Sequence, residues 1–195
     1  LAFAAQPRVW GAQADAVNTA VARLARTIAR HQPVSVLCRP EQLKQAQDRC
    51  GRDNIEFLEV PLDDIWVRDY GGCFVTNDRG GLGLVDFNFN GWGGKQSARN
   101  DGAVAPWLAQ VTGATLLESD LVGEGGGIEV DGHGTAILTE SCWVNRNRNP
   151  DWSRAEIEAE LKHHLGLRKV IWLPGIAGED ITDAHVDFYA RFVRP

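Results

Sequence analysis

The chain has 195 residues, of which 26 are acidic and 20 basic, so its formal net charge is −6, and 44% of its residues are hydrophobic. This size and mixture are typical of a globular domain with its own hydrophobic core, and the acidic balance excludes the basic stripe of a nucleic-acid-binding protein. No run of 18 apolar residues occurs, which excludes a membrane-spanning helix, and the opening LAFAAQP lacks the basic start of a signal peptide.

The first sixty residues predict two helices and two strands. A helix is expected from Asp15, as its N-cap, to Arg30, because four apolar residues recur at helical spacing. These four are Val17, Val21, Leu24 and Ile28. A buried strand at 34–38, a short helix at 41–49 stopped by Gly51, and a second strand at 55–60 follow.

From residue 71 onward, one pattern of hairpin, helix and strand occurs twice. In the first copy, strands at 73–76 and 82–89 flank NDRGG, and a helix at about 98–110 precedes a strand at 114–117. In the second copy, strands at 127–130 and 135–139 flank a turn at 131–134, where Asp-Gly predicts a hairpin with positive φ at both residues. The helix that follows begins at Ser153, with Glu156 at capping-box spacing, and precedes a strand at 169–173.

The pattern predicts a repeat architecture within one partial domain, residues 1–195. Two complete units are expected at about 71–118 and 127–173, with partial units at both ends. Repeats of this length are typical of stacked or circular folds, in which each unit buries a face against its neighbours. A third hairpin is predicted to begin at His185, and because the chain stops within it, we expect a cut rather than a finished structure.

The sharpest chemical pattern is TDAHVDFYARFV, residues 182–193. Its alternation predicts a strand with His185, Asp187, Tyr189 and Arg191 on one face. The opposite face would carry Val186, Phe188, Ala190 and Phe192. An imidazole and a carboxylate on one face can bind one small ligand together. A polar strand face in water fits the same pattern, and one His-x-Asp pair has too few ligands to argue for a metal.

A second pattern is DDIWVRDYGG, residues 63–72, with three carboxylates, Arg68 and Trp66 ahead of a hairpin. Binding groups concentrate in such loops. The indole of Trp66 beside carboxylates suits a flat cation through cation–π attraction. A solvated charged loop, with Arg68 in a surface ion pair, is the alternative.

A third pattern is GEGGGIEV, residues 123–130. It departs from the dinucleotide-binding glycine motif, and a strand follows it, so a phosphate cradle is not expected. We interpret the glycines as allowing close approach of the backbone, with Glu124 pointing at what it approaches. A tight turn with an exposed Glu124 is the alternative.

Asp69, Glu124 and His185 each lie at or just before a predicted hairpin. In a circular arrangement they would converge near the central axis. Together with Asp187 they would form a poor core but a plausible site for a cationic substrate.

Four other features are weaker candidates. The loop 88–95 could cover a pocket or only connect elements, and residues 146–150 are interpreted as a loop into the next helix. His163 and His164 fall in the last turn of a helix, which favours a structural role. Cys73 is the best internal nucleophile candidate because it lies near Asp69, but a small buried thiol explains it better.

The composition has two further consequences. No methionine occurs, even at position 1, so we expect a chain that is processed, truncated or recorded without its ends. The cysteines have no CxxC spacing, and scattered thiols predict a reducing, cytoplasmic location. They are Cys38, Cys50, Cys73 and Cys142.

Five ordered motifs resemble those of the agmatine deiminase family, with bacterial peptidyl-arginine deiminases as the nearest relatives. They are IWVRDYGG, FNFNGWGGK, EGGGIEVDGHGTAILTE, NRNP and TDAHVDFYARFVRP, and the resemblance runs from Leu1 to Pro195. It implies an α/β fold, the five-fold pseudo-symmetric propeller of ββαβ units (pentein-like), of which about half to three-fifths is present. It also implies hydrolysis of a guanidino group, in agmatine or a related compound, to the ureido product and ammonia, without metal or organic cofactor. Such an activity belongs to polyamine metabolism.

The resemblance assigns roles to five residues. Asp69 and Asp187 would each bind guanidinium nitrogens, since carboxylates match that planar fork. Trp66 would wall the substrate channel, and His185 would act as general acid and base. Glu124 would hold the site together or contact substrate.

The nucleophile of that family is a cysteine in a C-terminal Gly-rich motif, which this sequence does not contain. We therefore expect the covalent cysteine outside this chain, inactivity of this chain alone, and the remainder of the propeller as its partner, on the same or a companion chain. A homo-oligomer is also possible, whereas nucleic acid and membrane are not expected partners. The alternative is a non-catalytic module that binds cationic guanidino ligands.

Two departures from the family concern the substrate. The acidic run before the histidine is short, since Glu179 and Asp180 are followed by Ile181, and Ala184 stands where a glycine is usual. A guanidino compound with a neutral or acidic tail therefore remains an alternative to agmatine.

Overall fold

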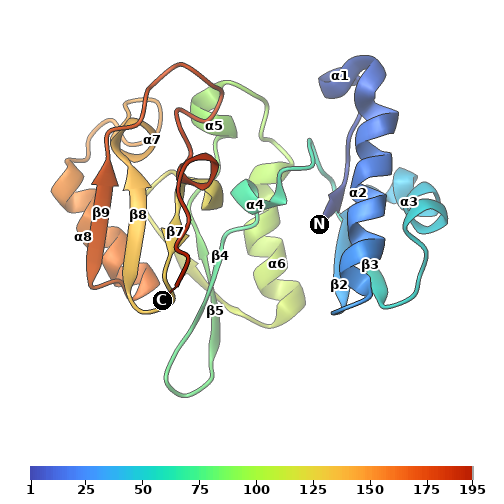
Figure 1. Cartoon of the computed structure of the whole chain (residues 1–195), viewed down its shortest axis with the longest axis horizontal. Coiled ribbons are helices and arrows are strands. Elements are labelled where there is room, and N and C mark those ends of the chain that lie inside the picture. The colour runs from blue at the N-terminus through green and yellow to red at the C-terminus, as the bar shows by residue number, and fades with distance from the viewer. Residues whose placement is uncertain (195) are drawn as a thin grey trace. The chain divides into compact units, whose positions relative to one another are not determined.

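The computed structural model describes residues 1–194 (Figure 1), so Pro195, the end of the last motif and of the predicted domain, lies outside the described residues. The chain divides into two compact units. The first is Leu1–Val67 with Arg99–Asp101, and the second comprises Arg68–Ala98 and the residues from Gly102 onward. The assignment of residues 1–195 to a single domain stays a prediction.

The first unit is built on a parallel sheet of three strands in the order β1-β2-β3. The strands are β1 (Ala2–Phe3), β2 (Val34–Cys38) and β3 (Ile55–Glu59). The helices are α1 (Pro7–Trp10), η1 (Gly11–Gln13), α2 (Ala14–Ala29), η2 (Pro40–Gln42) and α3 (Leu43–Cys50), where η denotes 3₁₀. Both predicted strands and both predicted helices are confirmed, and Gly51 caps α3.

The buried face of α2 is rotated from the predicted one. Its buried residues are Ala14, Asn18, Ala22 and Ala25, whereas Leu24 is 47% exposed. Asn18 fixes this orientation, because its side chain accepts a hydrogen bond from the Ala5 N–H and donates one to the Ala5 carbonyl. The helix also begins one residue before Asp15, which therefore lies in its first turn and is not the N-cap.

The second unit contains two sheets with the same strand connections. In each, an antiparallel hairpin is followed by a helix and a third strand parallel to the second. The first sheet is β4 (Cys73–Thr76), β5 (Leu82–Asp86) and β6 (Thr115–Glu118). The second is β7 (Glu129–Val130), β8 (Thr135–Thr139) and β9 (Lys169–Leu173). The helices are α4 (Val67–Tyr70), α5 (Gly91–Gly94), η3 (Asp101–Ala103), α6 (Val104–Thr112), η4 (Gly125–Gly127), α7 (Glu140–Trp143), α8 (Arg154–Leu165) and η5 (Val186–Phe188), and the first residue of α4 and of η3 is assigned to the first unit.

Local sequence rules account for the start and the end of helix α8. Ser153 and Glu156 form the predicted capping box at the start of α8, and Gly166 ends the helix in a left-handed conformation. The turn between β7 and β8 differs from the prediction, because positive φ occurs at Gly132 and Gly134 and not at Asp131. The Asp131 carboxylate instead accepts the His133 and Thr135 N–H groups.

The predicted third hairpin at His185 is wrong. Among the described residues, no strand follows β9, and residues 186–188 form the 3₁₀ helix η5. The alternation of side chains is therefore not that of a strand face: Val186 is buried, while Phe188 and Tyr189 are both exposed. The preceding turn reverses the chain, since Asp183 and Ala184 have φ of 60° and 69°.

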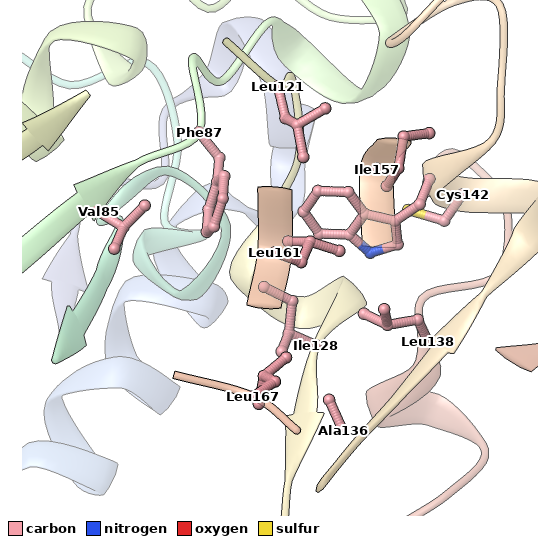
Figure 2. Close-up of a cluster of buried hydrophobic side chains, with 11 residues drawn as sticks. Val85, Phe87, Leu121, Ile128, Ala136, Leu138, Cys142, Ile157, Leu161 and Leu167 are labelled. Carbon is pink, nitrogen blue, oxygen red and sulfur yellow. The ribbon is translucent and has the colours of Figure 1, made fainter. Parts of the chain in front are cut away.

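A hydrophobic cluster lies between these elements of the second unit (Figure 2). The indole of Trp143 is fully buried there, with its ring centroid 5.6 Å from that of Phe87. Its Nε1–H donates to the carbonyl of Gly127 at 2.9 Å. The core therefore fixes the glycine-rich segment that carries Glu124.

Within the described residues, no helix is both long and apolar enough to cross a lipid bilayer.

Candidate active site

The glycines of residues 123–127 allow the backbone to approach other groups at distances that a side chain would prevent. A Cβ on Gly125 would lie 2.2 Å from the Arg68 carbonyl, and one on Gly123 would lie 2.2 Å from the Trp143 ring. Glu124, held between them, is fully buried. The interpretation of close backbone approach is thus confirmed, and the alternative of an exposed glutamate is wrong.

Gly126 marks the centre of the site. A Cβ there would lie 2.5 Å from His185 Nδ1, 2.6 Å from Asp69 Oδ1 and 3.1 Å from Asp187 Oδ2. One imidazole and two carboxylates thus surround a single backbone position. Three of the predicted residues, from segments more than 50 residues apart, come together here.

Asp69 is held in place by two donors. The Gly126 N–H donates to Oδ1, and the Trp92 Nε1–H donates to Oδ2, both at 3.0 Å. Burial raises the pKa of Asp69, and the neighbouring charge of His185 and the Trp92 hydrogen bond oppose that rise. A bound cation would favour the ionised carboxylate for the same electrostatic reason.

His185 lies between two carboxylates. Its Nε2 is 3.2 Å from Glu124 Oε2, and its Nδ1 is 3.6 Å from Asp69 Oδ1. The residue is 2% exposed. A proton on either nitrogen therefore faces an acceptor, which is the geometry that acid–base chemistry needs. The alternative of a polar face in water is wrong for His185, while Asp187 is half-buried.

Trp66 belongs to the first unit. Its ring stacks on that of Trp10, with centroids 6.1 Å apart, and Trp66 is 42% exposed. Trp10 in turn donates through Nε1 to Asp64 Oδ1 at 2.7 Å. Asp63 and Asp64 are buried, so the alternative of a solvated charged loop is wrong for this segment.

Arg148, whose segment was predicted to be only a loop into the next helix, is central to the second unit. Its side chain is fully buried, and Nε donates to both Glu124 oxygens at 2.9 and 3.0 Å. Its Nη1 donates to Asp183 Oδ2 at 2.8 Å. No local signal identified it, because its partners lie 24 and 35 residues away.

Loop 88–95 also contributes to the site directly. Trp92 is buried and bonds Asp69, while the Lys95 ammonium lies 2.7 Å from Asp183 Oδ2. Burial raises the pKa of Asp183, but hydrogen bonds from Lys95, Arg148 and Asn147 outweigh that effect and hold it below the usual range. The loop therefore does more than connect two elements.

Within residues 1–194, Arg68 forms no ion pair with an acidic side chain, so the alternative of a surface ion pair is wrong. Its Nη2 donates to the Ile128 carbonyl at 3.1 Å.

His163 and His164 lie in the last turn of α8, as predicted, and His164 Nε2 is 2.9 Å from Glu160 Oε1.

One group of side chains in the described part of the chain has the spacing of metal ligands. Ligand atoms of Glu124, Cys142 and His185 lie within 4.8 Å of one another, all buried. The donor set does not suit a cation, because the Arg148 guanidinium already bonds both oxygens of that carboxylate. Burial and the charge of Glu124 also raise the pKa of Cys142, which opposes the thiolate that a metal needs.

The pKa values of the other three thiols are raised as well. Burial raises the pKa of Cys50, and it raises the pKa values of Cys38 and Cys73 to about 11. Since the thiolate is the nucleophile, none of the four described cysteines has an activating environment. Cys73 is only half-buried, so the interpretation of it as a small buried thiol is met in part.

The chain is similar in sequence to known proteins over its whole length. The model of the Porphyromonas-type peptidyl-arginine deiminase family matches residues 1–195. The agmatine deiminase of Ectopseudomonas mendocina is 44% identical over 95% of this chain and 51% of its own length. That of Stutzerimonas stutzeri is 42% identical over 97% of this chain and 53% of its own. The chain thus spans about half the length of the curated relatives it matches.

The chain is also similar in structure to a solved protein of this kind. The agmatine deiminase of Enterococcus faecalis, solved while catalysing its reaction, superposes with a TM-score of 0.94 at 32% identity. The match covers 100% of this chain and 55% of that one. The match confirms the predicted α/β fold class. This chain corresponds to about half of the complete fold seen in the solved structure.

Proposed function

Because the chain belongs to the Porphyromonas-type peptidyl-arginine deiminase family, we propose that it carries the guanidinium-binding part of an enzyme that hydrolyses a guanidino group. The products would be a ureido compound and ammonia. The observation that carries the proposal is the grouping of Asp69, Asp187 and His185 around the bare backbone of Gly126. Because Gly126 has no side chain, these three groups can face one small planar cation.

Asp69 and Asp187 would bind the guanidinium nitrogens. Carboxylates accept paired hydrogen bonds from the planar N–H groups of a guanidinium, and such charge-assisted bonds strengthen in a water-poor site. Trp66, with its exposed indole, would wall the channel through which the substrate enters, since an indole face attracts a flat cation.

His185 would move the protons of two successive steps. In the first, a cysteine thiolate forms a bond to the guanidinium carbon, and one C–N bond breaks as His185 protonates the departing ammonia. In the second, water gives one proton to His185 while its oxygen bonds the same carbon. The C–S bond then breaks to release the thiolate, and the remaining hydroxyl proton leaves to solvent as the ureido C=O forms. Glu124, beside His185 Nε2, would hold the imidazole in orientation.

We propose that the attacking cysteine lies outside this chain. The raised pKa values of all four described thiols support this assignment. The chain's natural partner would then be the remainder of the propeller, and no nucleic acid or membrane is involved. We also propose a cytoplasmic location, because all four thiols are free, and a homo-oligomer as a further assembly.

Agmatine is the first substrate to test, because the relatives are named for it. The acidic run before the histidine has two residues, of which only Glu179 is exposed, since Asp180 accepts the Thr182 N–H and folds into the turn. A single exposed carboxylate would bind the terminal ammonium of agmatine less strongly than a longer acidic run would. A guanidino compound with a neutral tail is therefore the second substrate to test.

The decisive experiment measures ammonia release by the protein in its full natural length, with agmatine, arginine and a peptidyl arginine. The proposal expects turnover of a guanidino compound and loss of turnover in Asp69→Asn. This chain alone should release none at an enzyme-like rate. Tight binding of agmatine by the full-length protein without turnover would favour the alternative, a non-catalytic module for cationic guanidino ligands.

A further inference from the structure

A single buried guanidinium joins the two parts of the candidate site. Arg148 and Glu124 both have fully buried side chains, and Nε of Arg148 donates to both carboxylate oxygens. Oε2 of Glu124 is also the oxygen that lies 3.2 Å from His185 Nε2. The arginine therefore fixes the carboxylate that faces the imidazole.

The other end of the same guanidinium holds the turn that presents His185. Nη1 donates to Asp183 Oδ2 at 2.8 Å, and Nη2 donates to the Thr182 carbonyl at 3.0 Å. Asp183 and Ala184 both have positive φ, a conformation that residues with a Cβ adopt at an energetic cost. Such a turn persists only where its surroundings enforce it.

We propose that Arg148 is a positioning residue for the hydrolysis, because it holds Glu124 and the turn 182–184 in the one arrangement that places the His185 imidazole against the carboxylate. This inference rests on the proposed function for its kinetic consequence. Its structural consequence, the placement of the imidazole, is independent of any turnover.

The number and direction of the bonds explain why arginine is needed. Nε, Nη1 and Nη2 together reach Glu124, Asp183 and Thr182, and Nη1 also donates to Asn147 Oδ1 at 2.9 Å. The ammonium of a lysine is a single point of charge and cannot span both carboxylates. Lys95 does not replace it, since its ammonium lies at Asp183 and the backbone carbonyls of Asp180 and Ile181.

The kinetic test compares Arg148→Lys with Arg154→Lys in the full-length protein. Arg154 is 54% exposed and pairs with Glu140 on the surface, so its substitution controls for the loss of any guanidinium. We expect kcat with a guanidino substrate to fall about tenfold or more in Arg148→Lys, with KM within about threefold of wild type. Arg154→Lys should match wild type in both. An unchanged kcat in Arg148→Lys would overturn the proposal.

A second measurement uses proton NMR of the histidine ring N–H groups. A proton on His185 Nε2, bonded to Glu124 in a buried site, should give a resonance protected from exchange, assigned by its loss in His185→Gln. We expect the resonance to be lost or shifted in Arg148→Lys and in Asp183→Asn, the second variant serving if the first does not fold. It should persist in Arg154→Lys.

The two measurements separate the two proposals. If the wild-type protein hydrolyses no guanidino compound but the resonance responds as expected, the proposed function fails and the positioning role stands. If hydrolysis is present and the resonance is unchanged in folded Arg148→Lys and Asp183→Asn, the positioning role fails.

Discussion

Glu124 and His185 are 61 residues apart in the sequence, yet Oε2 of one lies 3.2 Å from Nε2 of the other. Gly126 lies on the other side of the imidazole, where a Cβ would come within 2.5 Å of His185 Nδ1. The contact depends on a buried arginine on one side and a bare backbone on the other. Both conditions give testable consequences.

Gly126→Ala should damage the site more than the fold. Its Cβ would lie 2.5 Å from His185 Nδ1 and 2.6 Å from Asp69 Oδ1, so both side chains must move. A displacement of about 1 Å costs about a hundredfold in rate, and such overpacking costs about 1–3 kcal/mol of stability. Ammonia release and thermal unfolding of the full-length protein measure both effects. Gly102→Ala, whose Cβ would meet only the Phe89 carbonyl at 3.1 Å, is the control, and equal rates in the two variants would contradict the prediction.

Asp101 should make the first unit less stable as the pH rises toward neutrality. Its carboxylate accepts the Asp63 and Asp64 N–H groups, and burial raises its pKa to about 7. A folded-state pKa above the unfolded value means that the protonated carboxyl stabilises the fold below about pH 4. That stability is lost as the pH rises through about 7, and the loss amounts to at most about 4 kcal/mol.

Urea unfolding at pH 5 and pH 8 measures this dependence. Asp101→Asn should flatten it, because the amide does not titrate. Asp78→Asn, in the exposed turn between β4 and β5, should leave the dependence unchanged. If stability changes by the same amount from pH 5 to pH 8 in the wild type and in both variants, Asp101 is not the cause of the change.

Residues with local partners were predicted from the sequence, and those with distant partners were not. The capping box of Ser153 and Glu156 spans three residues, and the hairpin of β4 and β5 closes over a short turn. Both follow from rules that act within one turn of chain. Arg148, Trp92 and Lys95 acquire their roles from partners 23 to 88 residues away, so no window of sequence reveals them.

The segment after Asp183 shows how a local rule can mislead. Alternating polar and apolar residues predicted a strand, but two residues with positive φ turn the chain immediately before His185. His185 and Asp187 still approach the same point, Gly126, because η5 brings Asp187 back toward it. The grouping of the two residues was therefore predicted correctly, although the reason for it was wrong.

The four thiols should react slowly in the folded chain. Burial raises the pKa of each, so little thiolate exists near neutral pH. Alkylation by iodoacetamide at pH 7.5, followed by mass spectrometry, should modify all four only after unfolding in urea. Rapid native modification of Cys142, the thiol beside Glu124, would instead indicate a nucleophile within this chain.

Ala184→Gly should stabilise the fold, because Ala184 has a φ of 69° and glycine adopts this conformation without a steric cost. The expected gain is about 1 kcal/mol, since a left-handed alanine costs about 1–2 kcal/mol and the flexibility of glycine in the unfolded chain offsets part of that. Ala46→Gly, in the buried interior of α3, should have the opposite sign and lose about 1 kcal/mol. Urea unfolding of both variants measures the pair. A loss of stability in Ala184→Gly equal to that in Ala46→Gly would show that packing of the buried Ala184 methyl outweighs the strain of its backbone.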